Sequence, residues 1–131
     1  IKAWKYADEE DVSPEEAEKM RDIPHSIRVL EISGPLFFAA ADQILDINSD
    51  RGTKAVIIRM RSVPAIDASA MKSLRELAKR AKKKKITLIF SHVNEQPMSV
   101  MEKDNFVEKV GRENFRTNIV DALEYAEKIV K

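Results

Sequence analysis

Residues 55–70 read AVIIRMRSVPAIDASA, and this stretch decides the fold class. Its first six residues are almost continuously apolar and rich in β-branched side chains, which is typical of a strand covered on both faces. A loop around Pro64 follows, and Asp67 stands where a helix would begin. From Met71 onward the apolar residues recur at helical spacing. The stretch therefore predicts a strand, a short loop and a helix in direct succession.

The same alternation continues on both sides of this unit. Downstream, residues 86–90 (ITLIF) form another apolar run rich in β-formers. Upstream, residues 26–32 predict a strand that ends at the turn Ser33-Gly34-Pro35. A short strand over 36–38 and a helix over about 40–48 are expected next. Strands that alternate with helices predict an α/β domain with a small mixed, mostly parallel sheet.

The two ends of the chain complete this organisation. Residues 1–25 combine a weakly alternating start with an acidic stretch, and we interpret them as a linker packed on the main domain, residues 26–131. A short helix is expected to begin at Pro97, because proline is favoured at the first helical position. Residues 114–116 predict a brief edge strand, and Asn118 is expected to cap a last helix.

The composition is typical of one globular domain. The chain has 131 residues, of which 44% are hydrophobic and 34% are charged. The absence of cysteine excludes disulfides, thiolate metal sites and cysteine nucleophiles. A net charge of +1 provides no overall field toward nucleic acid, so no nucleic-acid partner is expected. The chain begins with Ile1 and not Met, which we interpret as a sign that it is a piece of a longer protein.

The residues that enzymes use are sparse. The two histidines, His25 and His92, have no spaced partner that would complete a metal site. The three glycines, Gly34, Gly52 and Gly111, form neither a dinucleotide-binding nor a Walker A loop. No GxSxG elbow is present either. We therefore expect a protein that is not an enzyme, with no metal and no cofactor. A small nucleotide-dependent enzyme is the least supported alternative.

The start of the helix after residue 66 carries the residues that point to a chemical modification. Asp67 is a natural N-cap, because its carboxylate can accept hydrogen bonds from free backbone N–H groups. Ser69 would lie in the first turn, where a phosphate would meet exposed N–H groups and the positive end of the helix dipole. Ser69 is therefore a candidate phosphorylation site. The alternative is that both residues only cap the helix.

Several segments together resemble a known family. Residues 34–42 (GPLFFAAAD) resemble the opening of the STAS domain in SulP-type sulfate and anion permeases. The later segments agree with that family in their order along the chain: the strand at 55–60, the turn at 63–69, the strand at 86–90 and the tail at 114–123. The resemblance covers residues 26–131. The segment Ala3-Trp4-Lys5-Tyr6, with the acidic stretch after it, resembles the connection that follows the last membrane helix of such transporters.

This resemblance implies a STAS fold with helices mainly on one side of the sheet. It implies a regulatory, non-catalytic domain of an integral membrane protein, on the cytoplasmic side of the inner membrane of a bacterium. Such a domain would contribute to the assembly or regulation of the transporter. The implied partners are the membrane domain of the same transporter, a cytosolic regulatory protein and a second copy of the domain.

STAS domains are also related to anti-sigma factor antagonists, which are phosphorylated in an Asp-Ser/Thr-Ser/Thr-Gly motif. Asp67 and Ser69 match two of those positions, whereas Ala68 and Ala70 depart from them. The alternative function is therefore a stand-alone antagonist switched by phosphorylation at Ser69.

A binding surface is the last expectation at this helix start. Nucleotide binding would need a pocket between residues 35–38 and the turn at 67–71. The residues of this interaction or nucleotide surface are Pro35, Phe37, Asp67, Ser69, Met71 and Lys72. The basic residues Arg75, Lys79, Lys82 and Lys83 are expected to face the inner leaflet or the acidic loops of the membrane domain.

Overall fold

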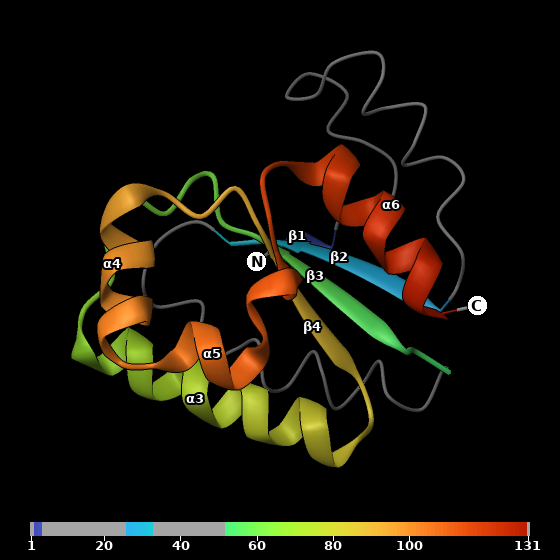
Figure 1. Ribbon diagram of the computed structural model, residues 1–131, viewed down its shortest axis with the longest axis horizontal. Helices are drawn as coiled ribbons and strands as arrows, with labels where there is room; N and C mark the ends of the chain where they lie inside the picture. The colour runs from blue at the N-terminus through green and yellow to red at the C-terminus, as the bar shows by residue number, and fades with distance from the viewer. Residues whose placement is uncertain (1, 4–25, 33–51, 131) are drawn as a thin grey trace.

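The computed structural model describes residues 2–3, 26–32 and 52–130 (Figure 1). Its five strands form one sheet in the order β1-β2-β3-β4-β5. Their bounds are Lys2–Ala3 for β1, Ile27–Glu31 for β2, Ala55–Arg59 for β3, Thr87–Ser91 for β4 and Phe115–Arg116 for β5. β1 runs antiparallel to β2, and every other neighbouring pair is parallel. The prediction of a mixed, mostly parallel sheet is therefore confirmed.

Some predicted features lie outside the described residues. These are the linker segment 4–25 with His25, the strand at 36–38, the helix at 40–48, and the surface candidates Pro35 and Phe37.

The centre of the sheet is β3. All five of its residues are buried, which is the outcome expected of a nearly continuous apolar run. β2 covers one of its edges and β4 covers the other, and the in-register partners of Ile58 are Leu30 and Phe90. Because both edges and both faces of β3 are covered, its register fixes the positions of the neighbouring strands.

The four α-helices of the described residues cover the two faces of this sheet (Figure 1). Their bounds are Ala68–Lys83 for α3, Glu95–Lys103 for α4, Phe106–Val110 for α5 and Ile119–Val130 for α6, with a 3₁₀ turn η2 at Arg112–Asn114. The helices α3, α4 and α5 pack on one face, and α6 packs on the other. Among the described helices, the prediction that most lie on one side is confirmed.

The two faces have separate cores because strand side chains alternate. Ile58 and Phe90 point into the larger core beneath α3, α4 and α5. Ile57 and Ile89 point the other way, toward α6. α6 contributes residues spaced three and four apart, which places them on one helical face: Ile119, Ala122, Leu123 and Ala126.

The helix boundaries follow local capping chemistry. α4 begins at Glu95, two residues before the Pro97 start that the sequence predicts, because a proline is tolerated anywhere in the first turn. Gly111 ends α5 with a backbone φ of 112°, a left-handed conformation that favours glycine. Asn118 caps α6 as predicted, since its Oδ1 accepts the Asp121 N–H at 2.9 Å.

One polar corner joins β5 to α6. The guanidinium of Arg116 donates two hydrogen bonds to the Asp121 carboxylate, Nη2 to Oδ1 at 2.8 Å and Nε to Oδ2 at 3.0 Å. The same guanidinium lies 4.6 Å from the ring centroid of Tyr125. The Tyr125 hydroxyl in turn donates to Asn114 Oδ1 at 2.7 Å. The hydrogen bonds from Arg116 hold the pKa of Asp121 below its usual value.

This lowered pKa predicts a dependence of stability on acid. A carboxylate whose folded pKa lies below its unfolded value of about 3.9 stabilises the fold at neutral pH, and that contribution is lost as the pH falls through the folded pKa. Asp121→Asn should cost about 1 kcal/mol at pH 7, after allowance for solvent exposure, and should flatten the stability profile below about pH 4. Urea unfolding across pH measures both effects.

The control is Glu108→Gln, which removes an ion pair with Arg112 in which both side chains are more than half exposed. We expect this variant to change the free energy of unfolding very little. An equal loss in the two variants would contradict the role assigned to the Arg116–Asp121 pair.

Candidate functional site

The candidate site is the junction between β3 and α3, which lies beyond the carboxyl end of the central strand. In open α/β sheets, this is the edge at which ligands and partners usually bind. Asp67 has an extended backbone, and its Oδ1 accepts the Ala70 N–H at 2.9 Å. The first intrahelical bond runs from the Met71 N–H to the Asp67 carbonyl oxygen at 3.0 Å. The predicted role of Asp67 as the N-cap is therefore confirmed.

Two side chains near the start of α4 hold the loop that leads to Asp67. The Asn94 Nδ2 donates to the carbonyl oxygen of Val63 at 2.9 Å and to that of Arg61 at 3.2 Å. Gln96 forms two hydrogen bonds with the backbone of Ile66. Its Oε1 accepts the Ile66 N–H at 2.8 Å, and its Nε2 donates to the Ile66 carbonyl oxygen at 3.2 Å. Sequence reasoning missed both residues, although polar side chains directly after a buried strand were a usable signal.

Among the predicted surface residues that the structure describes, three are exposed close together and one is buried. Asp67, Ser69 and Lys72 are exposed in or next to the first turn of α3. Met71 is only 3% exposed and belongs to the larger core. Its inclusion in a binding surface was wrong, because its place on the helix aligns it with Leu74 on the face that packs against the sheet.

Ser69, the candidate phosphorylation site, lies in the first turn of α3. Its side chain is exposed, and α3 has no acidic residue in its first turn. The Asp67 carboxylate already takes the Ala70 N–H, while the first N–H groups of a helix have no intrahelical partner. A phosphate on Ser69 would find such donors, but it would also lie close to the negative charge of Asp67.

Within residues 2–3, 26–32 and 52–130, no cluster of three or more His, Cys, Asp or Glu side chains could hold a metal ion. His92 is exposed just after β4, and its backbone N–H donates to the Arg116 carbonyl oxygen at 3.1 Å. No helix in these same ranges has the length and apolar character needed to span a membrane.

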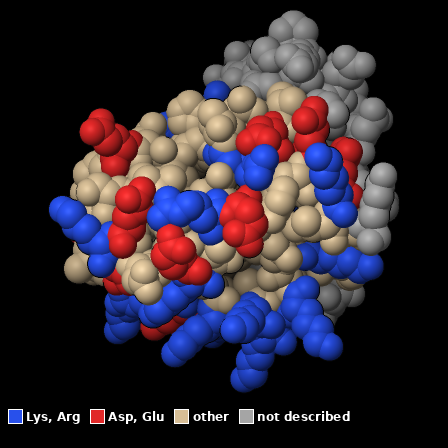
Figure 2. All heavy atoms as spheres, in the orientation of Figure 1, with Lys and Arg blue, Asp and Glu red and all other residues tan. Residues whose placement is uncertain are grey.

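Positive charge gathers along the exposed side of α3, where Figure 2 shows many Lys and Arg side chains at the lower edge of the molecule. Lys79, Lys82 and Lys83 are exposed there. Arg75 differs from them, because its Nη1 forms an ion pair at 2.5 Å with Asp104, the residue that caps the end of α4. The predicted basic face therefore consists mainly of lysines in the second half of α3.

Comparison with known proteins gives consistent matches. The family model described as "STAS domain" matches residues 18–122. A sulfate transporter family protein from Wolinella succinogenes has 32% sequence identity and a TM-score of 0.77, covering 90% of this chain and 98% of that one. The STAS domain of a SulP transporter from Vibrio cholerae has 26% identity and a TM-score of 0.74, covering 82% of this chain and 85% of that one.

Two plant proteins are similar in sequence. "Sulfate transporter 4.1, chloroplastic" from Arabidopsis thaliana is 29% identical over 115 residues, and "Probable sulfate transporter 4.2" from the same plant is 27% identical over 115 residues. Each alignment covers 76% of this chain. The chain spans only 17% of the length of these relatives.

The capping role of Asp67 gives a direct prediction. Asp67→Ala should lower the free energy of unfolding by about 1 kcal/mol, because the Ala70 N–H loses its partner. Asp67→Asn keeps an acceptor oxygen at the same place and should retain most of the stability. Urea denaturation of the two variants makes the comparison. Equal losses would show that charge, and not capping, is what Asp67 provides.

Proposed function

This chain belongs to the STAS domain family and is homologous to the STAS domains of SulP sulfate transporters, and on that premise we propose that it is a non-catalytic regulatory and interaction domain of an anion transporter. In this proposal it lies on the cytoplasmic side of the membrane, joined to the membrane domain of the same polypeptide. It binds that domain, a second copy of itself or a cytosolic regulator, and thereby controls assembly or transport.

The observation that carries the proposal is the exposed start of α3, which follows a loop held by side-chain hydrogen bonds. Asp67, Ser69 and Lys72 present polar and charged groups of both signs to solvent, while Asn94 and Gln96 fix the loop beneath them. A partner would meet a surface whose backbone is already in place, which lowers the entropic cost of binding.

The lysines in the second half of α3 support an orientation toward the membrane. A cytoplasmic leaflet rich in anionic lipid attracts nearby basic residues over roughly one Debye length, about 8 Å at physiological ionic strength. Lys79, Lys82 and Lys83 are exposed on one helix and would lie favourably toward such a surface. The start of α3 would then stay accessible to protein partners at the other end of the same helix.

The test uses the full-length transporter that contains this chain. Ala68→Arg and Lys72→Glu each change an exposed residue at the start of α3 without removing the Asp67 cap. We expect each to reduce sulfate uptake, or the amount of transporter in the membrane, severalfold. The matched control is Lys128→Glu on α6, an exposed lysine on the opposite side of the sheet, which should behave as wild type.

Two results would contradict the proposal. One is unchanged uptake and unchanged membrane abundance after deletion of the whole domain. The other is a reading frame that begins near Ile1 with no hydrophobic span of about 20 residues upstream.

A second candidate function is a phosphorylation switch at Ser69, and the exposure of this serine in the first turn of α3 favours it. A phosphate would add about −1.5 to −2 charges to a surface spot that otherwise holds both signs. Incubation with ATP and a serine kinase from the same organism should add the mass of one phosphoryl group, and Ser69→Ala should abolish the gain. Ser99→Ala, which removes an exposed serine on α4, should leave it intact. A gain that persists in Ser69→Ala would rule out this switch.

A further inference from the structure

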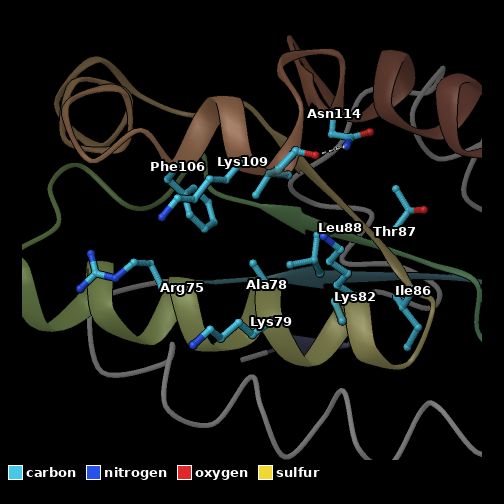
Figure 3. A pocket seen from close by; sticks show the side chains of 12 residues that line it. Arg75, Ala78, Lys79, Lys82, Ile86, Thr87, Leu88, Phe106, Lys109 and Asn114 are labelled. Carbon is cyan, nitrogen blue, oxygen red and sulfur yellow. Dashed lines mark hydrogen bonds between the residues drawn. The ribbon is translucent and has the colours of Figure 1, made fainter.

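A recess of about 530 Å³ lies between α3 and α5, and the first residues of β4 form part of its wall (Figure 3). Its volume falls within the range of about 300–1,000 Å³ that is usual for small-molecule sites. The α3 residues that line it run from Arg75 to Lys82. The recess is therefore separate from the helix start that carries Ser69, although its rim includes Lys79 and Lys82, two of the lysines that the proposal above turns toward the membrane.

The inner wall of the recess is apolar, and aromatic rings of the core pack against it. Leu88 from β4, Phe106 from α5 and Ala78 from α3 meet there. The Phe106 ring stands edge-on to Phe90, with centroids 5.7 Å apart and an interplanar angle of 76°. It also stands edge-on to Phe115, at 6.4 Å and 89°. Because these contacts fix the Phe106 ring, the apolar wall is formed before any ligand arrives.

The rim of the recess is positively charged. Lys79 and Lys82 come from α3, and Lys109 comes from α5 on the opposite wall (Figure 3). Within the described part of the chain, these three ammonium groups have no ion-pair or hydrogen-bond partner. Arg75, at one end of the recess, is instead already paired with Asp104. Three cations thus border an apolar wall, and no anion among residues 2–3, 26–32 and 52–130 pairs with them.

An apolar wall with a cationic rim is complementary to an alkyl chain that ends in an anion. The methylene stems of the lysines would add apolar contact along such a chain, while their ammonium groups stay at the solvent edge. The recess lies beside the second half of α3, toward the negative end of the helix dipole. A singly charged carboxylate is better tolerated there than a phosphate of about −1.5 to −2 charges.

We propose that this recess binds a long-chain fatty carboxylate. The alkyl chain would contact Leu88 and Phe106, and the carboxylate would lie among the ammonium groups of Lys79, Lys82 and Lys109.

The test is a titration of the 131-residue chain with dodecanoate below its micelle-forming concentration, followed by calorimetry and methyl NMR. We expect saturable binding, with the largest shifts at Leu88 and Val110. Acetate carries the head group without the chain, and dodecyltrimethylammonium carries the chain with the opposite charge. Both should bind at least about tenfold more weakly, acetate because it lacks the apolar contacts of the chain and dodecyltrimethylammonium because its head group is repelled by the lysines.

Charge reversals on one helix provide the matched variants. Lys79→Glu/Lys82→Glu should weaken dodecanoate binding by about tenfold or more. Lys72→Glu/Lys83→Glu makes the same change in net charge on the same helix, at exposed lysines that do not line the recess, and should stay within about twofold of wild type. Ala78→Met narrows the recess without changing its charge and should also weaken binding.

Several outcomes would overturn the proposal. They are the absence of saturable binding, equal binding of dodecyltrimethylammonium, and equal losses in the two double variants. Tighter binding of dodecyl phosphate than of dodecanoate would overturn the assignment of a carboxylate head group. Circular dichroism of each variant separates a loss of binding from a loss of fold.

Discussion

The burial of β3 is the constraint on which the rest of the structure depends. Ile57 and Ile58 point into opposite cores, and each is 0% exposed. At about 25 cal/mol per Å² of apolar surface removed from water, two such side chains stabilise the fold by several kcal/mol. A shift of one residue in the strand register would exchange the two faces, so the two cores together fix where β3 ends. The loop to α3 can begin at only one place.

That fixed end decides which residues become a surface. The loop after β3 is held by Asn94 and Gln96, and Asp67 then starts α3 with its carboxylate on the Ala70 N–H. α3 is amphipathic, so Leu74 and Leu77 are buried while the lysines on the other side face solvent. One helix thereby carries two separate features, a polar start that suits a protein partner and a basic second half that borders an apolar recess.

For the described residues, local patterns in the sequence were sufficient to predict the main elements but not the contacts between them. The strand at 55–60, the Asp67 cap and the Asn118 cap are each encoded within a few residues, and the structure has all three. The Asn94–Val63 contact joins residues 31 positions apart, and no local pattern contains it. Met71 was misplaced for a different reason. It was grouped with the turn at 67–71, although the helical spacing had already aligned it with Leu74 on the apolar face. The recess could not be predicted from the sequence, because its walls come from α3, β4 and α5, which only the folded chain brings together.

In the proposed function, the start of α3 is the face that meets a partner. A photo-crosslinking residue in place of Ala68, an exposed position in the first turn, tests it most directly in the full-length protein within its native membrane. We expect a defined adduct from position 68, with the membrane domain, a second copy or a cytosolic protein. We expect no adduct when the same residue replaces Lys128 on α6. Adducts from neither position, or the same adducts from both, would contradict this role of the α3 start.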